Sequence, residues 1–249
     1  MTKKFGIIGN PIKHSLSPVL HNYWFEKYKI DANYSILDIR EIELKNVIEK
    51  IKSKELNGIN ITLPYKQKIV SYIDVLINDA LITSSVNTVF INDEGSVIGE
   101  NTDVFGLQAA YLKEVDTTHN KKTLVIGAGG VSPSVILSLQ KSGVKDISII
   151  NRTKEKCIFL KKKFKNLNIL DWDDLKEIIK DYDIIFNATS LGLKNGDEFD
   201  FNFEKTKQKL IYIDTIYNPL ETKTLKYLKS REIKVFNGLD MFIYQGQKA

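Results

Sequence analysis

Apolar runs and amphipathic stretches alternate along most of the chain. Short apolar runs rich in β-branched residues predict strands in the first half at residues 5–8, 34–39, 58–63, 86–91 and 96–98. Similar runs in the second half predict strands at residues 123–126, 146–150, 168–170, 183–187, 210–213 and 233–236. Apolar residues at helical spacing predict helices at residues 17–28, 42–52, 66–72, 104–113, 131–142, 154–164, 172–180 and 221–229. Strands that alternate with helices indicate an α/β protein with parallel sheets, and the turn at residues 92–95 indicates one hairpin.

Two local signals refine this pattern. Ser17 is expected to cap the first helix, with Pro18 as its first helical residue, because serine accepts a backbone hydrogen bond there and proline needs none. The polar segment 116–122 is expected to be a short connector. A chain of 249 residues has room for two modest domains, since one domain commonly takes roughly 100–200 residues.

Composition indicates the kind of protein and the cellular compartment in which it is expected. Hydrophobic residues make up 43% of the chain and charged residues 27%, which is typical of a globular protein with a sizeable core. No apolar run approaches the roughly 20 residues that span a bilayer, and the run near the N-terminus is too short for a signal peptide. The single cysteine, Cys157, excludes an intramolecular disulfide and a cysteine-based metal cluster. We therefore expect a cytoplasmic protein without a metal site.

The formal net charge of +5 raises the possibility of a nucleic-acid partner. However, the lysines are spread along predicted surface helices and often lie beside acidic residues, as at residues 41–45. The longest basic cluster, residues 161–163, ends a predicted helix, where cations suit the helix dipole. Nucleic acid would require a basic face with aromatic residues, which the sequence does not show. We expect small anionic ligands and no nucleic-acid or membrane partner.

A glycine-rich loop follows the predicted strand at residues 123–126. The loop reads Gly127-Ala128-Gly129-Gly130-Val131-Ser132 and leads into a predicted helix. Gly127 and Gly129 allow a tight turn and a close approach of the backbone to a pyrophosphate, which the helix N-terminus attracts. Ser132, at the third fingerprint position, is small but is not glycine. The strand–loop–helix context favours a dinucleotide site over a merely structural turn.

The end of the next strand indicates which dinucleotide is bound. Asn151-Arg152-Thr153 begins 24 residues after Gly127, where NAD sites commonly carry an acidic residue for the ribose 2′-hydroxyl. This chain has Arg152 instead, with Lys154 and Lys156 close behind. A guanidinium can hold a 2′-phosphate, whereas a carboxylate would repel it. The sequence therefore predicts NADP, the alternative being an arginine that is simply exposed.

Polar clusters follow the predicted strands of the first half. They are Ser15 and Ser17 in HSLSP, Asn60, Thr62 and Lys66 in NITLPYK, Asn87 and Thr88 in SVNTV, and Asn101 and Asp103 in GENTD. Each has a simple local explanation, such as a helix cap or a turn. Together, in this order and ahead of a GAGG loop, they strongly resemble shikimate dehydrogenase. The resemblance extends over essentially the whole chain, through NATSLG at 187–192, Asp214, Tyr217-Asn218-Pro219, Asn237-Gly238-Leu239-Asp240-Met241 and Gln245.

The resemblance implies an NADP-dependent oxidoreductase that interconverts 3-dehydroshikimate and shikimate on the route to chorismate and aromatic amino acids. It implies that Lys66 and Asp103 are the catalytic pair and also touch substrate, with the other substrate contacts from Ser15, Ser17, Thr62, Asn87 and Gln245. The implied NADP contacts are Gly127, Ala128, Gly129, Gly130, Val131, Asn151, Arg152, Thr153 and Lys156, and on the nicotinamide side Thr189, Ser190, Tyr217, Gly238 and Met241.

The residue types also suit this chemistry directly. Carbonyl reduction needs a hydride from the cofactor and a proton for the developing alkoxide, which a lysine ammonium oriented by an aspartate can supply. We expect two α/β domains: residues 1–103, joined by returning residues 238–249, bind substrate, and residues 104–237 form a Rossmann-type NADP-binding domain with a parallel sheet. The active site would lie between them, in a monomer or homodimer.

The chain departs from the family's usual sequence at two places, and two alternative functions remain open. Pro133 stands where the family usually has a basic or other side chain, so NADP affinity is expected to be weaker. Relatives usually continue past Ala249 with a long helix, so either a truncation or weaker closure on substrate is expected. One alternative is a quinate/shikimate dehydrogenase that uses NAD or NADP, and the other is a non-catalytic NADP-binding regulatory module.

Overall fold

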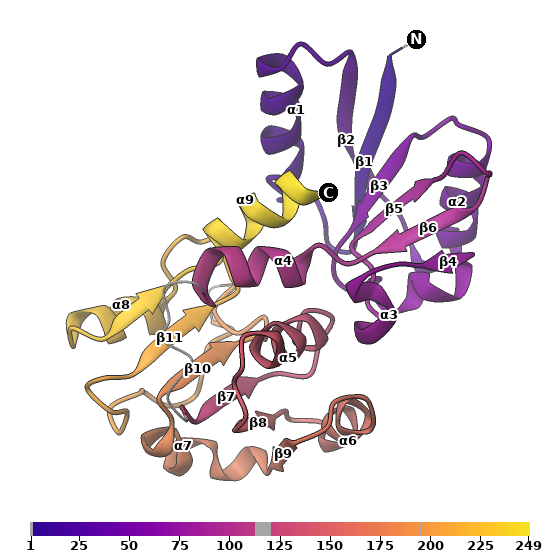
Figure 1. Cartoon of the computed structure of the whole chain (residues 1–249). Helices are drawn as coiled ribbons and strands as arrows, with labels where there is room; N and C mark the ends of the chain where they lie inside the picture. Colours follow the sequence, from indigo (N-terminus) through magenta and orange to yellow (C-terminus); the bar gives the residue numbers. More distant parts are fainter. Residues whose placement is uncertain (1, 113–120, 195) are drawn as a thin grey trace. The chain divides into compact units, whose positions relative to one another are not determined.

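The computed structural model describes residues 2–112, 121–194 and 196–249. Packing divides the chain into two compact units (Figure 1). One unit comprises Met1–Asp103 and Gln245–Ala249, and the other Val104–Tyr244. The segment expected to return to the first unit was 238–249, but residues 238–244 pack with the second unit, where Met241 is buried in the core.

The first unit is built on a six-stranded mixed sheet of order β2-β1-β3-β5-β6-β4. Its strands are β1 (Lys3–Gly9), β2 (Ala32–Asp38), β3 (Gly58–Ile61), β4 (Val75–Leu76), β5 (Thr88–Ile91) and β6 (Val97–Glu100). β1 pairs in parallel with β2 and β3, and β5 runs antiparallel to β3 and β6, so the predicted hairpin is confirmed. Its helices are α1 (Ser17–Lys27), α2 (Leu44–Lys52) and α3 (Asp79–Thr83).

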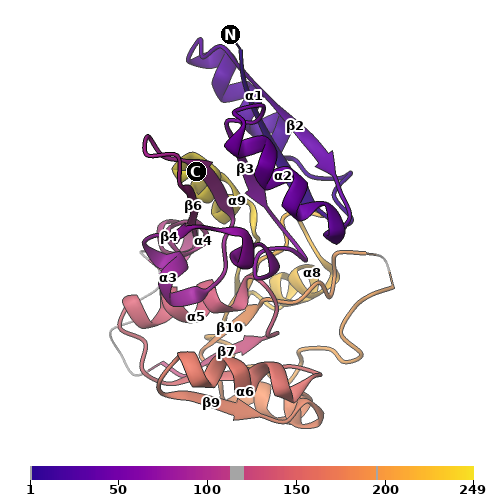
Figure 2. The same cartoon turned by 90° about the vertical axis from the view of Figure 1, so that its right-hand side faces the viewer.

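Alternation along β1 gives the sheet of the first unit two packed faces. Ile7 packs with Tyr34 and with Phe25 of α1, whereas Ile8 packs with Leu44 and Val47 of α2. Successive strand residues point to opposite faces, so this one strand holds both helices (Figures 1 and 2).

The second unit contains six parallel strands in the order β12-β11-β10-β7-β8-β9. They are β7 (Thr123–Ile126), β8 (Ile147–Ile150), β9 (Leu167–Leu170), β10 (Ile184–Asn187), β11 (Ile211–Asp214) and β12 (Lys234–Phe236). Numbered from β7, this is the 3-2-1-4-5-6 order of doubly wound dinucleotide-binding folds. The helices of the second unit include α5 (Ser132–Lys141), α6 (Lys154–Lys163), α7 (Leu175–Ile178) and α8 (Lys223–Ser230). Most of α4 (Asp103–Leu107) and α9 (Leu239–Lys248) also belongs to this unit, but Asp103 and the residues from Gln245 onward belong to the first.

Neighbouring residues of β7 separate two cores in the second unit. Val125 packs with α5 and α6, while Leu124 and Ile126 pack with α7 and α8. Strands buried on both faces explain the continuous apolar runs in the sequence. The predicted fold class, two α/β domains of which the second has a parallel Rossmann-type sheet, is confirmed.

Several local predictions were wrong. Leu16, not Ser17, is the N-cap of α1, and Ser17 is already helical. The helix predicted at 42–52 begins with a 3-10 turn, Glu41–Glu43, and Ile42 is 81% exposed rather than buried. Residues 68–72 form a 3-10 helix, and residues 172–181 form three short helical segments instead of one regular helix.

The helix predicted at 104–113 also differs. α4 ends at Leu107 and is followed by a π-helical segment, Gln108–Leu112. Residue 113 and residues 116–120 of the predicted connector lie outside the described residues.

Candidate active site

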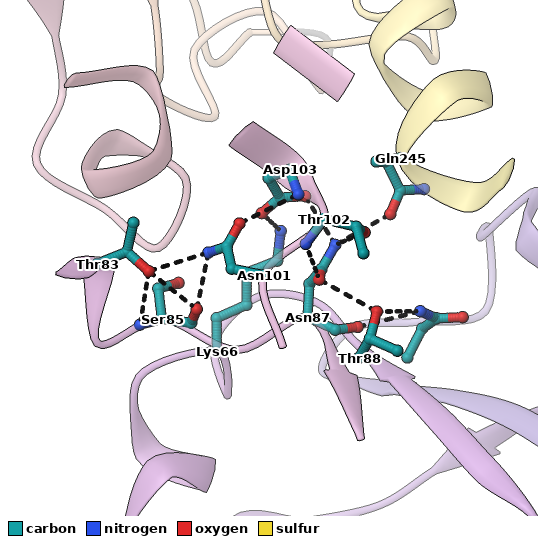
Figure 3. A network of polar contacts seen from close by, with 10 residues as sticks. Lys66, Thr83, Ser85, Asn87, Thr88, Asn101, Thr102, Asp103 and Gln245 are labelled. Carbon is teal, nitrogen blue, oxygen red and sulfur yellow. Dashed lines mark hydrogen bonds and ion pairs between the residues drawn. The ribbon is translucent and has the colours of Figure 1, made fainter. Parts of the chain in front are cut away.

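Lys66 and Asp103 form an ion pair in the first unit. Lys66 Nζ lies 2.6 Å from Asp103 Oδ2, and the two side chains are 13% and 3% exposed (Figure 3). Lys66 follows β3 and Asp103 follows β6. β5 lies between these two strands and pairs antiparallel with each, so β3 and β6 run in the same direction and their carboxyl ends lie at the same end of the sheet. The sheet topology thus brings together two residues that are distant in sequence.

Asn87 fixes the other oxygen of Asp103. Its Nδ2 lies 3.0 Å from Asp103 Oδ1, 2.8 Å from Thr102 Oγ1 and 3.1 Å from Gln245 Oε1. An amide nitrogen has two protons, so it can donate to only two of these three acceptors at once. The Thr102 N–H donates to Asn87 Oδ1 at 2.8 Å, which sets the orientation of the amide. Asn87 therefore links the predicted catalytic pair to Gln245.

A second buried amide supports the backbone of Asp103. Asn101 Oδ1 accepts from the Asp103 N–H at 3.1 Å, and Asn101 Nδ2 donates to the Ser85 carbonyl at 2.7 Å and to Thr83 Oγ1 at 3.2 Å (Figure 3). The sequence predictions did not include Thr83 and Ser85, since α3, which carries Thr83, was not predicted. The GENTD loop is thus held by neutral hydrogen bonds in addition to its ion pair.

Asn60 connects this network to β2. Its Nδ2 donates to the Asn87 carbonyl and to Thr88 Oγ1, both at 3.1 Å, and its Oδ1 accepts from the Tyr34 hydroxyl at 2.7 Å. The sequence placed Asn60 in a polar cluster but gave it no role. Through these bonds Asn60 holds Thr88, the first residue of β5, and Asn87, which precedes it.

The three predicted hydroxyl residues follow β1 and β3. The Ser17 N–H donates to Ser15 Oγ at 3.3 Å, and the Thr62 N–H donates to the Ile8 carbonyl at 2.9 Å. Since β1 and β3 are parallel neighbours, these residues follow the same ends of the two strands. Among the described residues, the structure gives no hydrogen bond between these three hydroxyls and the Lys66–Asp103 pair.

The second unit contains a preformed glycine loop. Gly127 has a φ of +110°, and a Cβ there would lie 2.8 Å from the Ala188 carbonyl oxygen, so only glycine fits. A Cβ on Gly129 would come no closer than 3.9 Å to the surrounding atoms, which leaves the space that a pyrophosphate needs. The Gly129 N–H donates to Ser132 Oγ at 2.9 Å, so the unusual third fingerprint residue braces the loop.

Asn151 ties this loop to the end of β8. Its Oδ1 accepts from the Ala128 N–H at 3.1 Å, and its Nδ2 donates to the Thr153 carbonyl at 2.9 Å. Pro133 is buried in the first turn of α5, where a helix leaves its backbone N–H groups without helical partners. The helix therefore accommodates Pro133 without losing a hydrogen bond.

The predicted phosphate-binding cations differ in their present contacts. Arg152 and Lys156 are exposed, and within the described ranges neither side chain forms a hydrogen bond or ion pair with another residue. Lys154 instead lies 2.5 Å from Asp171 Oδ1, and this hydrogen bond raises the pKa of its ammonium. Arg152 and Lys156 are therefore available to an anionic ligand, while Lys154 already has an anionic partner.

The residues predicted for the nicotinamide side lie in three segments of the second unit. Thr189 donates from its N–H and its Oγ1 to Asn187 Oδ1 at 3.1 and 2.6 Å, and Ser190 next to it is exposed. The ring of Tyr217 stacks on Phe242 with centroids 4.4 Å apart. The last segment carries Gly238 and the core residue Met241, and a Cβ on Gly238 would lie 2.3 Å from the Thr215 carbonyl oxygen.

Other observations limit the chemistry of the site. Burial raises the pKa of the Cys157 thiol to about 11, consistent with a packing role in the core. Within the described residues, no group of three His, Cys, Asp or Glu side chains is arranged to hold a metal ion. No helix in the same set of residues is long and apolar enough to cross a membrane.

Fold and site together define a class of protein. A parallel sheet in the 3-2-1-4-5-6 order, with a glycine loop after its first strand, is the architecture of dinucleotide-binding α/β proteins. The separate first unit supplies the buried lysine–aspartate pair. The chain is a two-unit dehydrogenase of the dinucleotide-dependent class.

Comparison with known proteins gives the family. Residues 7–89 match the shikimate dehydrogenase substrate binding domain, and residues 110–230 match the family described as shikimate / quinate 5-dehydrogenase. The chain belongs to the shikimate dehydrogenase family, as its motifs predicted.

Individual relatives resemble the chain over nearly its full length. It is 45% identical over 251 residues to the NADP(+) shikimate dehydrogenase of Pelagibacter ubique (strain HTCC1062), covering 100% of this chain and 92% of that protein. The crystal structure of the Aquifex aeolicus shikimate dehydrogenase superposes with a TM-score of 0.91 at 38% identity, covering 99% of this chain and 90% of that one. The Thermus thermophilus shikimate 5-dehydrogenase in complex with NADP(H) and shikimate superposes with a TM-score of 0.86 at 29% identity, covering 98% and 90%.

Proposed function

We propose that this protein catalyses the reversible, NADP-dependent reduction of 3-dehydroshikimate to shikimate. The observation that carries the proposal is the Lys66–Asp103 ion pair, held at 2.6 Å in a chain of this family. The protein would act in the route to chorismate and aromatic amino acids, in the cytoplasm, as a monomer or homodimer.

In the proposed reaction, NADPH held by the glycine loop, Arg152 and Lys156 would supply the hydride that reduces the carbonyl carbon. As the carbon accepts the hydride, the π electrons of the C=O bond move onto the oxygen. Lys66 donates a proton from Nζ to this oxygen, so the product is an alcohol. Asp103 keeps the ammonium oriented and neutralises its charge, since its Oδ2 is already paired with Nζ. Lys66 then regains its proton from solvent, and the oxidation of shikimate follows the same path in reverse.

The substrate is proposed to bind through short polar side chains. Asn87 and Gln245 are hydrogen-bonded to each other and, through Asn87, to Asp103, which supports a role in holding a substrate hydroxyl beside Lys66. The hydroxyls of Ser15, Ser17 and Thr62 follow strand ends at the same edge of the sheet and are proposed to hold the carboxylate and remaining hydroxyls. Hydroxyl and amide groups suit a small polyhydroxylated acid.

NADP is proposed to bind the second unit. The lack of close contacts around Gly129 supports pyrophosphate contact along Gly127, Ala128, Gly129, Gly130 and Val131. Arg152 and Lys156, helped by Asn151 and Thr153, would hold the 2′-phosphate, and no carboxylate occupies the position of Arg152. Thr189, Ser190, Tyr217, Gly238 and Met241 would line the nicotinamide side.

One assay tests both substrate and cofactor. Purified protein is mixed with shikimate or quinate, each with NADP⁺ or NAD⁺, and the rise of the NADPH or NADH absorbance band is followed. We expect the largest kcat/KM for shikimate with NADP⁺. A larger value for quinate would assign the protein to quinate oxidation, which the matched family description also includes. No reduced cofactor with any of the four pairs would contradict the proposed activity.

A further inference from the structure

Asp214 is a buried carboxylate at the end of β11 that receives hydrogen bonds from three different segments. Its Oδ1 accepts from Asn187 Nδ2 at 3.2 Å and from the Ile216 N–H at 3.0 Å, and its Oδ2 accepts from Thr222 Oγ1 at 3.1 Å. Asp214 is 0% exposed. A single side chain thereby joins the end of β10, the loop after β11 and the start of α8.

The first of these contacts leads to Thr189. Asn187, which bonds Asp214, also accepts from the Thr189 N–H and Oγ1, and its Nδ2 donates to the Leu191 carbonyl at 3.1 Å. Asn187 is itself fully buried. The orientation of its amide therefore sets where Thr189 and the adjacent Ser190 lie.

The other two contacts lead to the remaining proposed nicotinamide residues. The Ile216 carbonyl accepts from the Gly238 N–H at 2.8 Å, and the next residue is Tyr217. Thr222 caps α8 by accepting from the Leu225 N–H, and a Cβ on Gly192 would lie 3.1 Å from its Cγ2. Every segment that carries a proposed nicotinamide contact is thus one or two hydrogen bonds away from Asp214.

We infer that Asp214 is a positioning residue for the nicotinamide half of the NADP(H) site. It does not itself contact the cofactor; it holds the 187–192 loop, the 215–217 turn and the Gly238 backbone in one arrangement. This inference rests on the proposed function, that the second unit binds NADP(H). The adenosine half of the site comprises Asn151 and Arg152, which follow β8, and Lys156 of α6, and among the described residues it makes no hydrogen bond to Asp214.

A carboxylate fits this position better than an amide. All three partners donate, and an ionised carboxylate has only acceptor sites. An asparagine could keep its oxygen toward Asn187 and Ile216, but its NH₂ group would then face Thr222 Oγ1 and reverse the direction of that hydrogen bond. Burial raises the pKa of Asp214 to about 6, against the lowering effect of its three hydrogen bonds, so the acceptor-only form exists above that pH. Burial, and to a smaller extent the charge of Asp214, raises the pKa of the phenols of Tyr111 and Tyr212, so neither phenol titrates in this pH range.

The test compares binding of whole and truncated cofactor by calorimetry. Asp214→Asn keeps the shape of the side chain and imitates its protonated form. At about pH 8 we expect it to weaken NADP⁺ binding about five-fold, because the hydrogen bond to Thr222 is reversed and the other two donors lose their charged acceptor. We expect no change for adenosine 2′,5′-bisphosphate, which lacks the nicotinamide half. The matched control is Asp183→Asn, at the opposite end of β10, where the carboxylate pairs with Lys207; both ligands should bind it normally.

A pH series separates positioning from a general structural defect. The ratio of the Asp214→Asn and wild-type NADP⁺ dissociation constants should fall toward one near pH 5, because wild-type Asp214 is then protonated. The ratio cancels the titration of the cofactor's own 2′-phosphate, whose second pKa is near 6. If Asp214→Asn does not fold, Thr222→Val removes one of the three donors and should show the same selective loss.

The outcomes are distinguishable. Equal weakening of both ligands, unchanged NADP⁺ binding, or a ratio independent of pH would overturn the positioning role and leave the proposed function standing. Wild-type protein that binds neither ligand near pH 8 would overturn the proposed function and this inference with it.

Discussion

Lys66 Nζ lies 2.6 Å from Asp103 Oδ2, while Asn87 Nδ2 lies 3.0 Å from the other oxygen of the same carboxylate. Both oxygens of Asp103 are therefore engaged, and its position is set from two directions. A lysine held in this way presents its ammonium in one place instead of sampling many rotamers. This fixed geometry is what a proton donor to a small ketone requires.

Removing the charge of Asp103 tests this arrangement. In Asp103→Asn, the amide NH₂ must face a donor on one side, either Lys66 or Asn87, so the lysine loses its anionic partner. We expect kcat to fall by about 10²-fold or more, in the range of general acid–base contributions, with little change in the dissociation constant of NADP⁺. Glu100→Gln is the control, since that carboxylate, at the end of β6, bonds Asn78 outside the pair. Near-normal kcat in Asp103→Asn would contradict the assigned role.

Cofactor choice is predicted to depend on Arg152. A hydrogen bond to a charged group contributes about 1.5–3 kcal/mol, so Arg152→Ala should raise the KM for NADP⁺ by about 10- to 100-fold. The KM for NAD⁺, which lacks the 2′-phosphate, should change little. Lys154→Ala should have a much smaller effect because Lys154 pairs with Asp171. Equal losses with the two cofactors would place the 2′-phosphate elsewhere.

Two glycines of one loop should respond differently to alanine. At Gly129 the new methyl group would come no closer than 3.9 Å to the Ala188 carbonyl oxygen, so the unfolding free energy should stay within about 0.5 kcal/mol while NADP⁺ binding falls. At Gly127 it meets the Ala188 carbonyl in a left-handed backbone, so we expect destabilisation of about 1–3 kcal/mol. For each variant, urea unfolding measures the free energy of unfolding and calorimetry measures NADP⁺ binding. Normal NADP⁺ binding by Gly129→Ala would contradict a pyrophosphate at the loop.

The sequence was sufficient for the fold class because its signals are local. The β-branched run at 123–126 followed by Gly127 identifies a strand and a turn without tertiary information. Arg152 could be singled out for the same reason, since a fixed spacing carries the prediction. The lysine–aspartate pair needed the family resemblance, because 37 residues separate its members and only the sheet brings them together.

Other features depend on tertiary contacts and could not be read from the sequence. Ser17 resembles a helix cap, but Leu16 is the N-cap and Ser17 is already the first helical residue, with its N–H donating to Ser15 Oγ. Ile42 fits the helical period, yet it lies in a 3-10 turn that points it to solvent. The role of Asp214 emerges only when its three donors, from three segments, are seen together.

Asp214 also predicts a pH dependence of stability. Burial raises its pKa from 3.8 to about 6, so the folded state holds this proton more tightly than the unfolded state. The stability gained from this proton is fully present below about pH 4 and is lost as the pH rises through about 6. A pKa shift of one unit corresponds to about 1.4 kcal/mol, so the contribution to the free energy of unfolding is about 3 kcal/mol. Asp214→Asn removes this contribution. Its unfolding free energy relative to wild type should therefore rise between about pH 4 and 7; a constant difference would contradict the raised pKa.

The proposed mechanism is tested most directly by a single turnover of Lys66→Ala. Excess enzyme, preloaded with NADPH, is mixed with 3-dehydroshikimate, and the loss of NADPH absorbance is followed for the variant and for wild type. Wild type should oxidise one NADPH per substrate molecule, whereas the variant should bind NADPH normally but react about 10²- to 10⁴-fold more slowly. Lys68→Ala, an exposed lysine paired with Glu41, should react like wild type. A near-wild-type single turnover by Lys66→Ala would contradict Lys66 as the proton donor.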